Sequence, residues 1–379
     1  MSVSRRLLLC ALSIALSPPA SGASEPARFK LISANGAAPL ERELRAAGAA
    51  GYRVLDAAYG PGLDGRRRIV ALMERGPRSG SYDYVVLAAA GDLDDEATRK
   101  VNALAAEGYR LARPGFLARR IEDWWLPPSA YDEQILLILT RASSARAYQY
   151  ASISFQGFGH LERYLADRHR EGFEILGLWN SARRLRFVLE KDLSSTTPTR
   201  PPTEVEADRY RLLIEAKKRS LRRRLNRAAA KGYRVIAAEN QSINAPPMLL
   251  LEKTAEPSEA LEYRFLHDPI KKKRKGKLER KLRKKAWHGY RVVADAVTPA
   301  MLTLERRPEL AWPAQYLALS SRTPPGLPRN MERAVAEGFR FVTLLVEAGE
   351  ATVLLEKLEN PATAQGFEGP SAASGDAAE

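Results

Sequence analysis

The chain has 379 residues, a formal net charge of +15 and one cysteine, Cys10. This length allows about two ordinary domains with a sizeable core. Because Cys10 lies in a segment that we expect to be removed, the mature chain should have no disulfide, no thiol catalysis and no cysteine-ligated metal.

The first 23 residues have the pattern of an export signal. Arg5 and Arg6 precede an apolar run from Leu7 to Leu16, and small residues lie before a cleavage site near Ala23. The run is too short to span a bilayer; the alternative is an unprocessed, buried N-terminal helix. We predict a signal peptide over 1–23, a periplasmic or otherwise exported protein, and no transmembrane span in the mature chain.

A glycine followed by an aromatic residue recurs six times: Gly51-Tyr52, Gly108-Tyr109, Gly172-Phe173, Gly232-Tyr233, Gly289-Tyr290 and Gly338-Phe339. Before each glycine, apolar residues recur at helical spacing, as Leu221 and Leu225 do before Gly232. A glycine just past such a stripe is typical of the left-handed residue that ends a helix. We therefore expect six helix stops at these glycines and no ligand contact.

After each aromatic residue, charged and apolar residues alternate, which is typical of a strand. A second strand with an apolar run and a charged end closes each repeat, and a further strand opens it. The sequence therefore predicts an α+β fold of six tandem β-α-β-β repeats, each a three-stranded sheet with one helix on one face. Apolar residues on the other face (Leu55, Leu176 and Val342) predict that it packs against another sheet or a neighbouring repeat.

The boundaries of these units follow from composition. The repeats are expected at 27–75, 82–141, 148–191, 208–253, 261–306 and 314–357. A Ser/Thr/Pro-rich linker is expected at 192–207 and a disordered tail at 360–379.

The repeat resembles short bacterial modules known as domain of unknown function 4177. Its best matches to that pattern are the segments Leu104 to Leu111 and Ala334 to Phe341, where Ala and Gly precede an aromatic residue and an alternating strand. Tyr or Phe replaces the Trp of those modules in all six repeats. The resemblance implies a fold and no activity.

An arginine follows the aromatic residue in five repeats, and a glutamate near the end of the closing strand also occurs in five. We expect these residues to face each other across the final hairpin, where opposite charges stabilise strand pairs. In the third repeat Glu174 would face Glu190 and repel it. The alternative is a row of arginines that reads one ligand per repeat.

The basic charge is concentrated in the second half, where 208–357 carries a net charge of +15. Two clusters lie in or before the fourth and fifth predicted helices, and they place like charges four residues apart, which destabilises a helix. Local stability therefore does not explain them; they are a solvated face or an anion-binding site. The candidate residues are Lys217, Lys218, Arg219, Arg222, Arg223, Arg224, Lys271, Lys272, Lys273, Arg274, Lys275, Lys277, Lys281 and Lys284.

Compartment limits the partner. For an exported protein we expect a polyanionic envelope component (a lipid headgroup, lipopolysaccharide or an acidic polymer) or an acidic protein. Nucleic acid is the alternative if 1–23 is not an export signal. The nearby aromatic residues, Trp287 and Tyr290, are expected in the core and so are not available to stack on bases.

Catalytic chemistry has no signature in the sequence. His160, His169, His267 and His288 form no metal-ligand spacing, and there is no nucleophile elbow, P-loop or dinucleotide motif. Trp124-Trp125 in the insertion of the second repeat is expected to cover a sheet edge, the alternative being an aromatic contact surface. We expect a non-enzymatic binding or scaffold module without a cofactor; an enzyme whose site lies between repeats is the remaining alternative.

Overall fold

The structure is a computed structural model that describes residues 27–61, 67–76, 80–90, 95–119, 134–142, 146–155, 160–181, 184–194, 208–215, 217–239, 246–254, 261–267, 275–298, 301–306, 314–321, 326–347 and 350–358. The expected signal peptide, the disordered tail, most of the linker and Trp124-Trp125 lie outside these ranges.

Six units of the same design follow one another, so the predicted fold class is confirmed. Unit 1 consists of β1 (Phe29–Ala34), α1 (Ala37–Ala49), β2 (Tyr52–Pro61) and β3 (Arg67–Arg75). Unit 2 consists of β4 (Asp83–Ala90), α2 (Asp95–Ala106), β5 (Arg110–Arg119) and β6 (Gln134–Arg141). Unit 3 consists of β7 (Tyr148–Phe155), α3 (Leu161–Arg170), β8 (Glu174–Ser181) and β9 (Arg184–Asp192).

The second half repeats the pattern. Unit 4 consists of β10 (Tyr210–Ile214), α4 (Lys218–Ala229), β11 (Tyr233–Glu239) and β12 (Met248–Lys253). Unit 5 consists of β13 (Glu262–His267), α5 (Lys275–Ala286), β14 (Tyr290–Thr298) and β15 (Met301–Arg306). Unit 6 consists of β16 (Ala314–Ser321), α6 (Gly326–Ala336), β17 (Arg340–Glu347) and β18 (Glu350–Leu358).

The helix stops form as predicted. All six repeated glycines have φ between 81° and 91°, the left-handed conformation that a side chain disfavours. The helical stripe before them is buried, for example Leu221 and Leu225 in α4 and Leu278 and Leu282 in α5. Burial of this stripe, and not helix propensity alone, holds each helix on its sheet.

The last strand of each unit is the central strand of its sheet. In unit 1 the order is β1-β3-β2, and both pairings are antiparallel. Ile69, Ala71 and Met73 of β3 face one hydrophobic cluster, whereas Val70 and Leu72 face another. Both faces of the sheet are therefore buried, which explains why the closing strands are continuous apolar runs instead of alternating ones.

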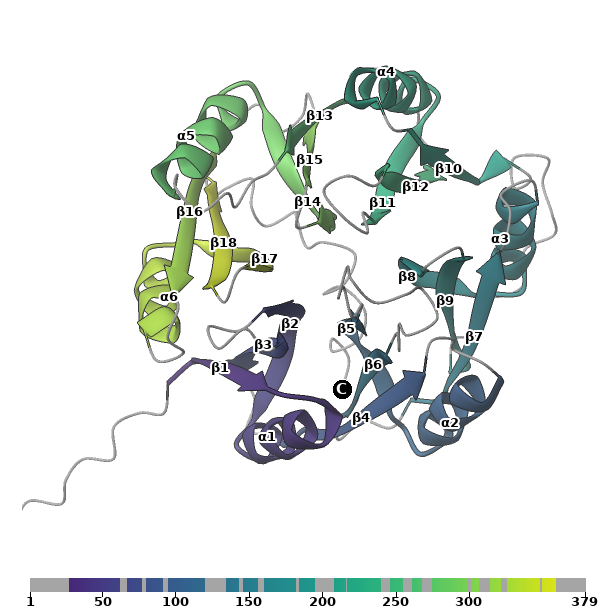
Figure 1. Ribbon diagram of the computed structural model, residues 1–379, viewed down its shortest axis with the longest axis vertical. Coiled ribbons are helices and arrows are strands. Elements are labelled where there is room, and N and C mark those ends of the chain that lie inside the picture. Colours follow the sequence, from purple (N-terminus) through teal and green to yellow (C-terminus); the bar gives the residue numbers. More distant parts are fainter. Residues whose placement is uncertain are drawn as a thin grey trace, which may run out of the picture.

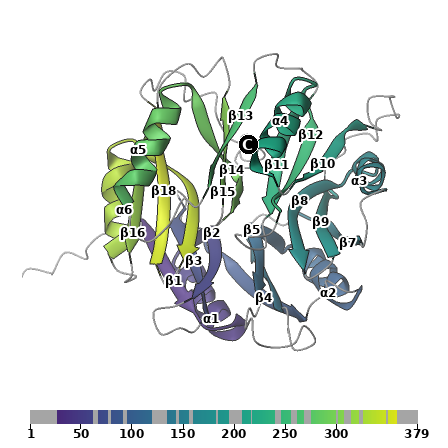
Figure 2. The same cartoon turned by 45° about the horizontal axis from the view of Figure 1, so that its top comes forward.

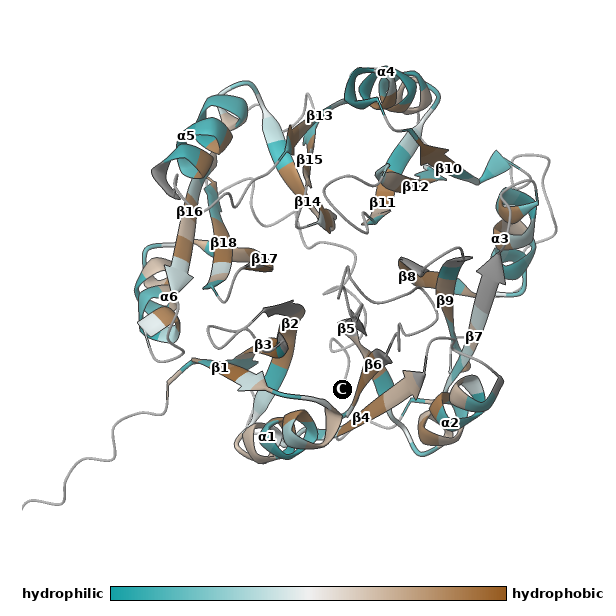
Figure 3. Cartoon of the chain, viewed as in Figure 1, coloured by the Kyte–Doolittle hydropathy of each residue, from teal (hydrophilic) through white to brown (hydrophobic). Residues whose placement is uncertain are grey.

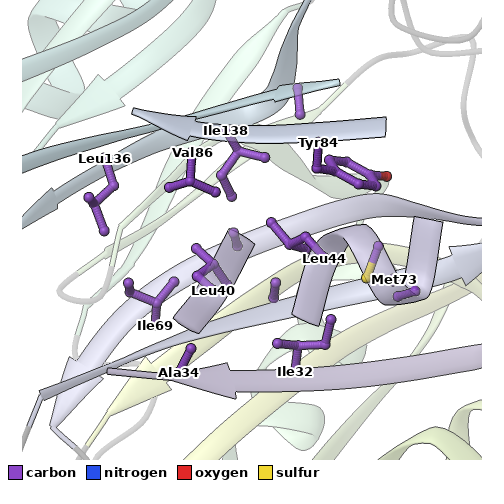
Figure 4. Close-up of a cluster of buried hydrophobic side chains, with 14 of the residues drawn as sticks. Ile32, Ala34, Leu40, Leu44, Ile69, Met73, Tyr84, Val86, Leu136 and Ile138 are labelled. Atoms are coloured by element: carbon purple, nitrogen blue, oxygen red, sulfur yellow. The ribbon is translucent and has the colours of Figure 1, made fainter. Parts of the chain in front are cut away.

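The six units form a closed ring, with the helices on the outside and the second strand of each unit nearest the centre (Figures 1 and 2). Each helix lies between its own sheet and the next one. The core of units 1 and 2, for instance, joins Leu40 and Leu44 of α1 to Val86 and Ile138 of unit 2 (Figure 4). The expectation that the second face of the sheet packs on a neighbouring unit is confirmed, since Leu55 packs on the core of unit 6.

Unit 6 closes the ring onto unit 1. Leu327 and Met331 of α6 share a core with Phe29 of β1. The Glu332 carboxylate accepts a hydrogen bond from the backbone N–H of Arg28 at 2.6 Å. On the inner side, buried Asp56 accepts one from the backbone N–H of Leu344 at 2.8 Å. The first and last units are thus neighbours, as every other consecutive pair is.

A buried tyrosine joins consecutive units. The Tyr150 hydroxyl in unit 3 accepts a hydrogen bond from the backbone N–H of Leu111 in unit 2 and donates one to Glu190. Val235 and Val292 donate in the same way to the next unit's tyrosine. The tyrosine is Tyr84 in unit 2 and Tyr150 in unit 3. In both units it is the second tyrosine of the strand predicted to open the repeat.

The repeated arginines and glutamates face each other as predicted, for example Arg53 opposite Glu74 and Arg340 opposite Glu356. They also connect units. Arg110 of unit 2 binds Glu190 of unit 3 at 2.7 Å. In unit 3 a glutamate, Glu174, takes the place of the arginine and lies opposite Glu190, as expected. Arg110 of unit 2 supplies the positive charge that Glu190 needs. The arginines therefore have a structural role at the junctions.

Candidate anion-binding surface

Helices α4 and α5 lie on the outside of the ring in consecutive units, with β13 of unit 5 packed against α4 and between the two helices (Figure 1). Their apolar stripes are committed to the core: Leu221 and Leu225 pack with the strands of units 4 and 5, and Leu278 and Leu282 pack with those of units 5 and 6. Most of the remaining residues are Lys or Arg, and both helices are largely hydrophilic (Figure 3). We call the outward surface of α4 and α5 the basic rim.

The basic rim includes most of the described candidate residues. Exposed side chains come from Lys217, Lys218, Arg219, Arg222, Arg223, Arg224, Lys281 and Lys284, and Lys277 is half-buried. Lys275 begins α5. Lys271, Lys272, Lys273 and Arg274 lie outside the described residues. The fold thus brings two clusters that are about 50 residues apart in the chain onto neighbouring helices.

Charge distinguishes these two helices from the other four. Both α4 and α5 have a net charge of +6, whereas α1 and α2 are neutral and α3 and α6 have +1 each. Neither α4 nor α5 has an acidic residue in its first turn, where the helix dipole favours one. The positive charge therefore accumulates at one side of the ring.

In each of the two neutral helices, one cation pairs with an acid of the same helix. Arg45 binds Glu41 in α1 at 3.2 Å, and Lys100 binds Glu96 in α2 at 2.6 Å, both four residues apart. In contrast, within the part of the chain that the structure describes, Arg219, Arg222, Arg223, Lys281 and Lys284 have no carboxylate within 4.0 Å. Exposed cations without acidic neighbours are available to an external anion.

One carboxylate does reach the start of α4. Glu215 accepts hydrogen bonds from the Ser220 hydroxyl at 2.9 Å and from the Lys217 backbone N–H at 3.3 Å. These hydrogen bonds lower its pKa, and Arg224 at 3.7 Å contributes less. Glu215 therefore supplies the acidic cap that α4 itself lacks, and it compensates Arg224 alone among the basic side chains of the helix.

Basic side chains from α4, β13 and α5 act on Lys285, near the end of α5. Its pKa lies below the ordinary lysine value, first because of partial burial and then because Arg264, Lys284 and Arg222 are close. Arg222 comes from α4 and Arg264 from β13, which lies between the helices in the chain. The charge of Arg222 on α4 therefore acts on a lysine of α5, whereas the nearby Glu262 acts in the opposite direction.

Trp287 corrects the expectation that both aromatic residues after α5 are in the core. Tyr290 is buried, but Trp287 is 74% exposed. Its position, two residues before the glycine, holds Ala49, Ala106 and Ala230 in other repeats, and all three are exposed. The exposed alanines show that this position lies off the buried stripe. The sign that was readable from the sequence is Arg170, a charged residue at the same position of the third repeat.

The histidines and acidic residues were the other candidate groups. The described residues contain no group of three or more His, Cys, Asp or Glu side chains arranged to hold a metal ion. His169 packs edge-on against Tyr210 of the next unit, and His267 lies beside Phe265. No helix within the described ranges has the length and hydropathy of a membrane span.

Comparison with known proteins adds no assignment: no protein-family model matches the chain and no curated protein matches it. The resemblance to the short bacterial modules therefore stays a prediction.

Proposed function

We propose that this protein is a non-enzymatic binding or scaffold module of the cell envelope, and that its basic rim docks on a polyanionic component there. The observation that supports this most directly is the concentration of exposed positive charge on α4 and α5, including Arg219, Arg222, Arg223, Lys281 and Lys284, beside four helices that are nearly neutral. Like charges four residues apart cost each helix stability. A bound polyanion offsets that cost, because it neutralises the repelling side chains.

The closed ring supports a scaffold role. Its six units all bury both faces of their sheets, so the binding surface is the outside of a rigid body rather than a segment that folds on contact. A preorganised surface loses little conformational entropy on binding. The envelope location rests on the predicted signal peptide, and sequencing the mature N-terminus tests it: an intact Met1 in the cytoplasm would favour nucleic acid instead.

A matched pair of full-length variants tests the rim. One variant replaces Arg219, Arg222, Arg223, Arg280, Arg283 and Lys284 by glutamine; the control replaces Arg42, Arg99, Lys100, Arg163, Arg329 and Arg333. All twelve side chains are exposed, and each variant lowers the net charge by six. Binding to inorganic polyphosphate is measured by calorimetry over a series of salt concentrations.

The rim variant should lose roughly a hundredfold or more in affinity, since each basic residue near an anionic surface contributes about 1 kcal/mol. The control should change affinity by much less, although its net charge is the same. Equal losses in both variants would show that only overall charge matters and would contradict the proposal.

A further inference from the structure

We propose that the partner of the basic rim is the anionic headgroup surface of a lipid membrane, with Trp287 as its interfacial anchor. This inference rests on the proposed function and adds the class of ligand. It starts from the exposure of Trp287, which phosphate binding by lysine and arginine leaves unexplained.

Trp287 directly follows α5, and its backbone N–H still donates a hydrogen bond to the Arg283 carbonyl at 2.9 Å, so the helical spacing reaches it. Arg280, Arg283, Lys284 and Trp287 follow one another at i, i+3, i+4 and i+7, and all four are exposed. Residues at this spacing share one helix face. The opposite face, with Leu282, is buried in the core of units 5 and 6. An indole therefore lies at the end of a cationic row, on the same outward surface.

A large apolar side chain at such a position is unusual for this molecule. Among the described residues, the only other exposed large hydrophobic side chain is Leu193, directly after β9, at 53%. Trp287 is not needed to fill a core, because the equivalent positions of other repeats hold exposed alanines. An exposed indole forgoes the favourable free energy of burying its apolar surface. A ligand with an apolar layer could bury that surface.

Membrane surfaces combine the two features that this face complements. Headgroup phosphates attract clustered Lys and Arg, and tryptophan favours the interface between headgroups and acyl chains, where its ring is partly buried and its N–H stays hydrogen-bonded. A soluble polyanion would use the cations alone. Single-stranded nucleic acid would stack on aromatic residues, but such sites present several of them along a groove, and the described part of this rim presents one, directly after the end of α5.

The test uses the full chain and three variants, Trp287→Ala, Trp287→Phe and, as a matched control, Leu193→Ala. Each is titrated with vesicles of phosphatidylglycerol and phosphatidylcholine, with vesicles of phosphatidylcholine alone, with inorganic polyphosphate and with a single-stranded oligonucleotide. Because both altered side chains are exposed, a thermal melt should show an unchanged midpoint and so confirm that each variant folds.

We expect Trp287→Ala to bind anionic vesicles about tenfold more weakly, the effect of losing one partly buried indole. Polyphosphate affinity should stay within about twofold of wild type, since charge is unchanged. Trp287→Phe should keep most vesicle binding, and Leu193→Ala should bind both ligands as wild type does.

Failure of the lipid inference and failure of the proposed function look different. If Trp287→Ala binds anionic vesicles as tightly as wild type, the anchor is refuted while the charge-based proposal survives. If the substitution weakens oligonucleotide binding and not vesicle binding, nucleic acid replaces lipid as the partner. If wild type binds neither vesicles nor polyphosphate, the proposed function itself is wrong.

Discussion

At the scale of single residues, the junctions depend on buried tyrosine hydroxyls that both accept and donate hydrogen bonds. Tyr84 accepts from the backbone N–H of Val54 at 3.0 Å and donates to the carbonyl of Tyr52 at 3.1 Å. Burial raises the pKa of Tyr84 to about 12. The folded protein therefore keeps this proton at a pH where the unfolded chain, with tyrosines near pKa 10, releases it.

This pKa shift predicts a pH dependence for the variant Tyr84→Phe. Near pH 8 the variant should be less stable by about 1–3 kcal/mol, because Val54 N–H and the Tyr52 carbonyl lose their partner. Between pH 10 and 12 the gap to wild type should narrow by about 1.4 kcal/mol per pH unit, since only wild type loses stability as its unfolded tyrosine ionises. Urea unfolding across this range measures it; a gap that stays constant up to about pH 11.5 would contradict the assignment.

The sequence identified these residues in part. The arginine and glutamate that face each other were readable as strand positions. The link from Arg110 to Glu190 was not, because it joins residues 80 positions apart whose proximity depends on how whole units stack.

At the scale of elements, each unit begins with an edge strand whose free backbone groups need partners. Side chains of the preceding helix supply some of them. Asn226 of α4 accepts a hydrogen bond from the backbone N–H of Tyr263 at 2.7 Å, and Glu41 of α1 accepts one from Val86 at 2.9 Å. Covering an edge in this way protects it from pairing with other chains.

The variant Asn226→Ala should reduce the free energy of unfolding by about 1–3 kcal/mol, because a backbone amide at a packed edge loses its acceptor. Arg227→Ala is the matched control on the same helix: its side chain is exposed, and a change of no more than about 0.5 kcal/mol is expected. Chemical denaturation of both variants gives the comparison. A similar loss in both would mean that the edge contact contributes nothing specific.

These helix contacts were only partly predictable. Asn102 and Asn226 both lie six residues before the repeated glycine, and Glu41, Glu162 and Glu279 lie ten before it. Because polar residues recur at these two helix positions, the sequence indicates that they have a shared function beside the apolar stripe. It does not say that the partner is backbone of the next unit, because the partner depends on the ring.

At the scale of the whole molecule, closure makes the six units equivalent in packing and leaves charge as the main difference among them. The sequence suggested two halves separated by the linker at 192–207, but α3 of unit 3 shares a core with the strands of unit 4 just as other consecutive units do. Repeat counting predicted the number of units. It could not predict closure, which depends on the small rotation between neighbours that side-chain packing sets.

The candidate site follows from the difference in charge among the six units. The basic clusters were visible in the sequence, and the fold added that α4 and α5 belong to neighbouring units on the outside of the ring and that Trp287 is exposed at the end of α5. Because units 1 and 6 complete each other's core, binding is best measured on the full chain and not on isolated halves.

Hydrogen–deuterium exchange of the full chain, with and without inorganic polyphosphate, tests the central claim most directly. Bound phosphate should relieve repulsion between like charges and slow local opening of the basic helices. Exchange should therefore become slower in α4 and α5, with no change in α1 and α2. Equal protection of all six helices, or none in α4 and α5, would contradict the claim that the basic rim is the binding surface.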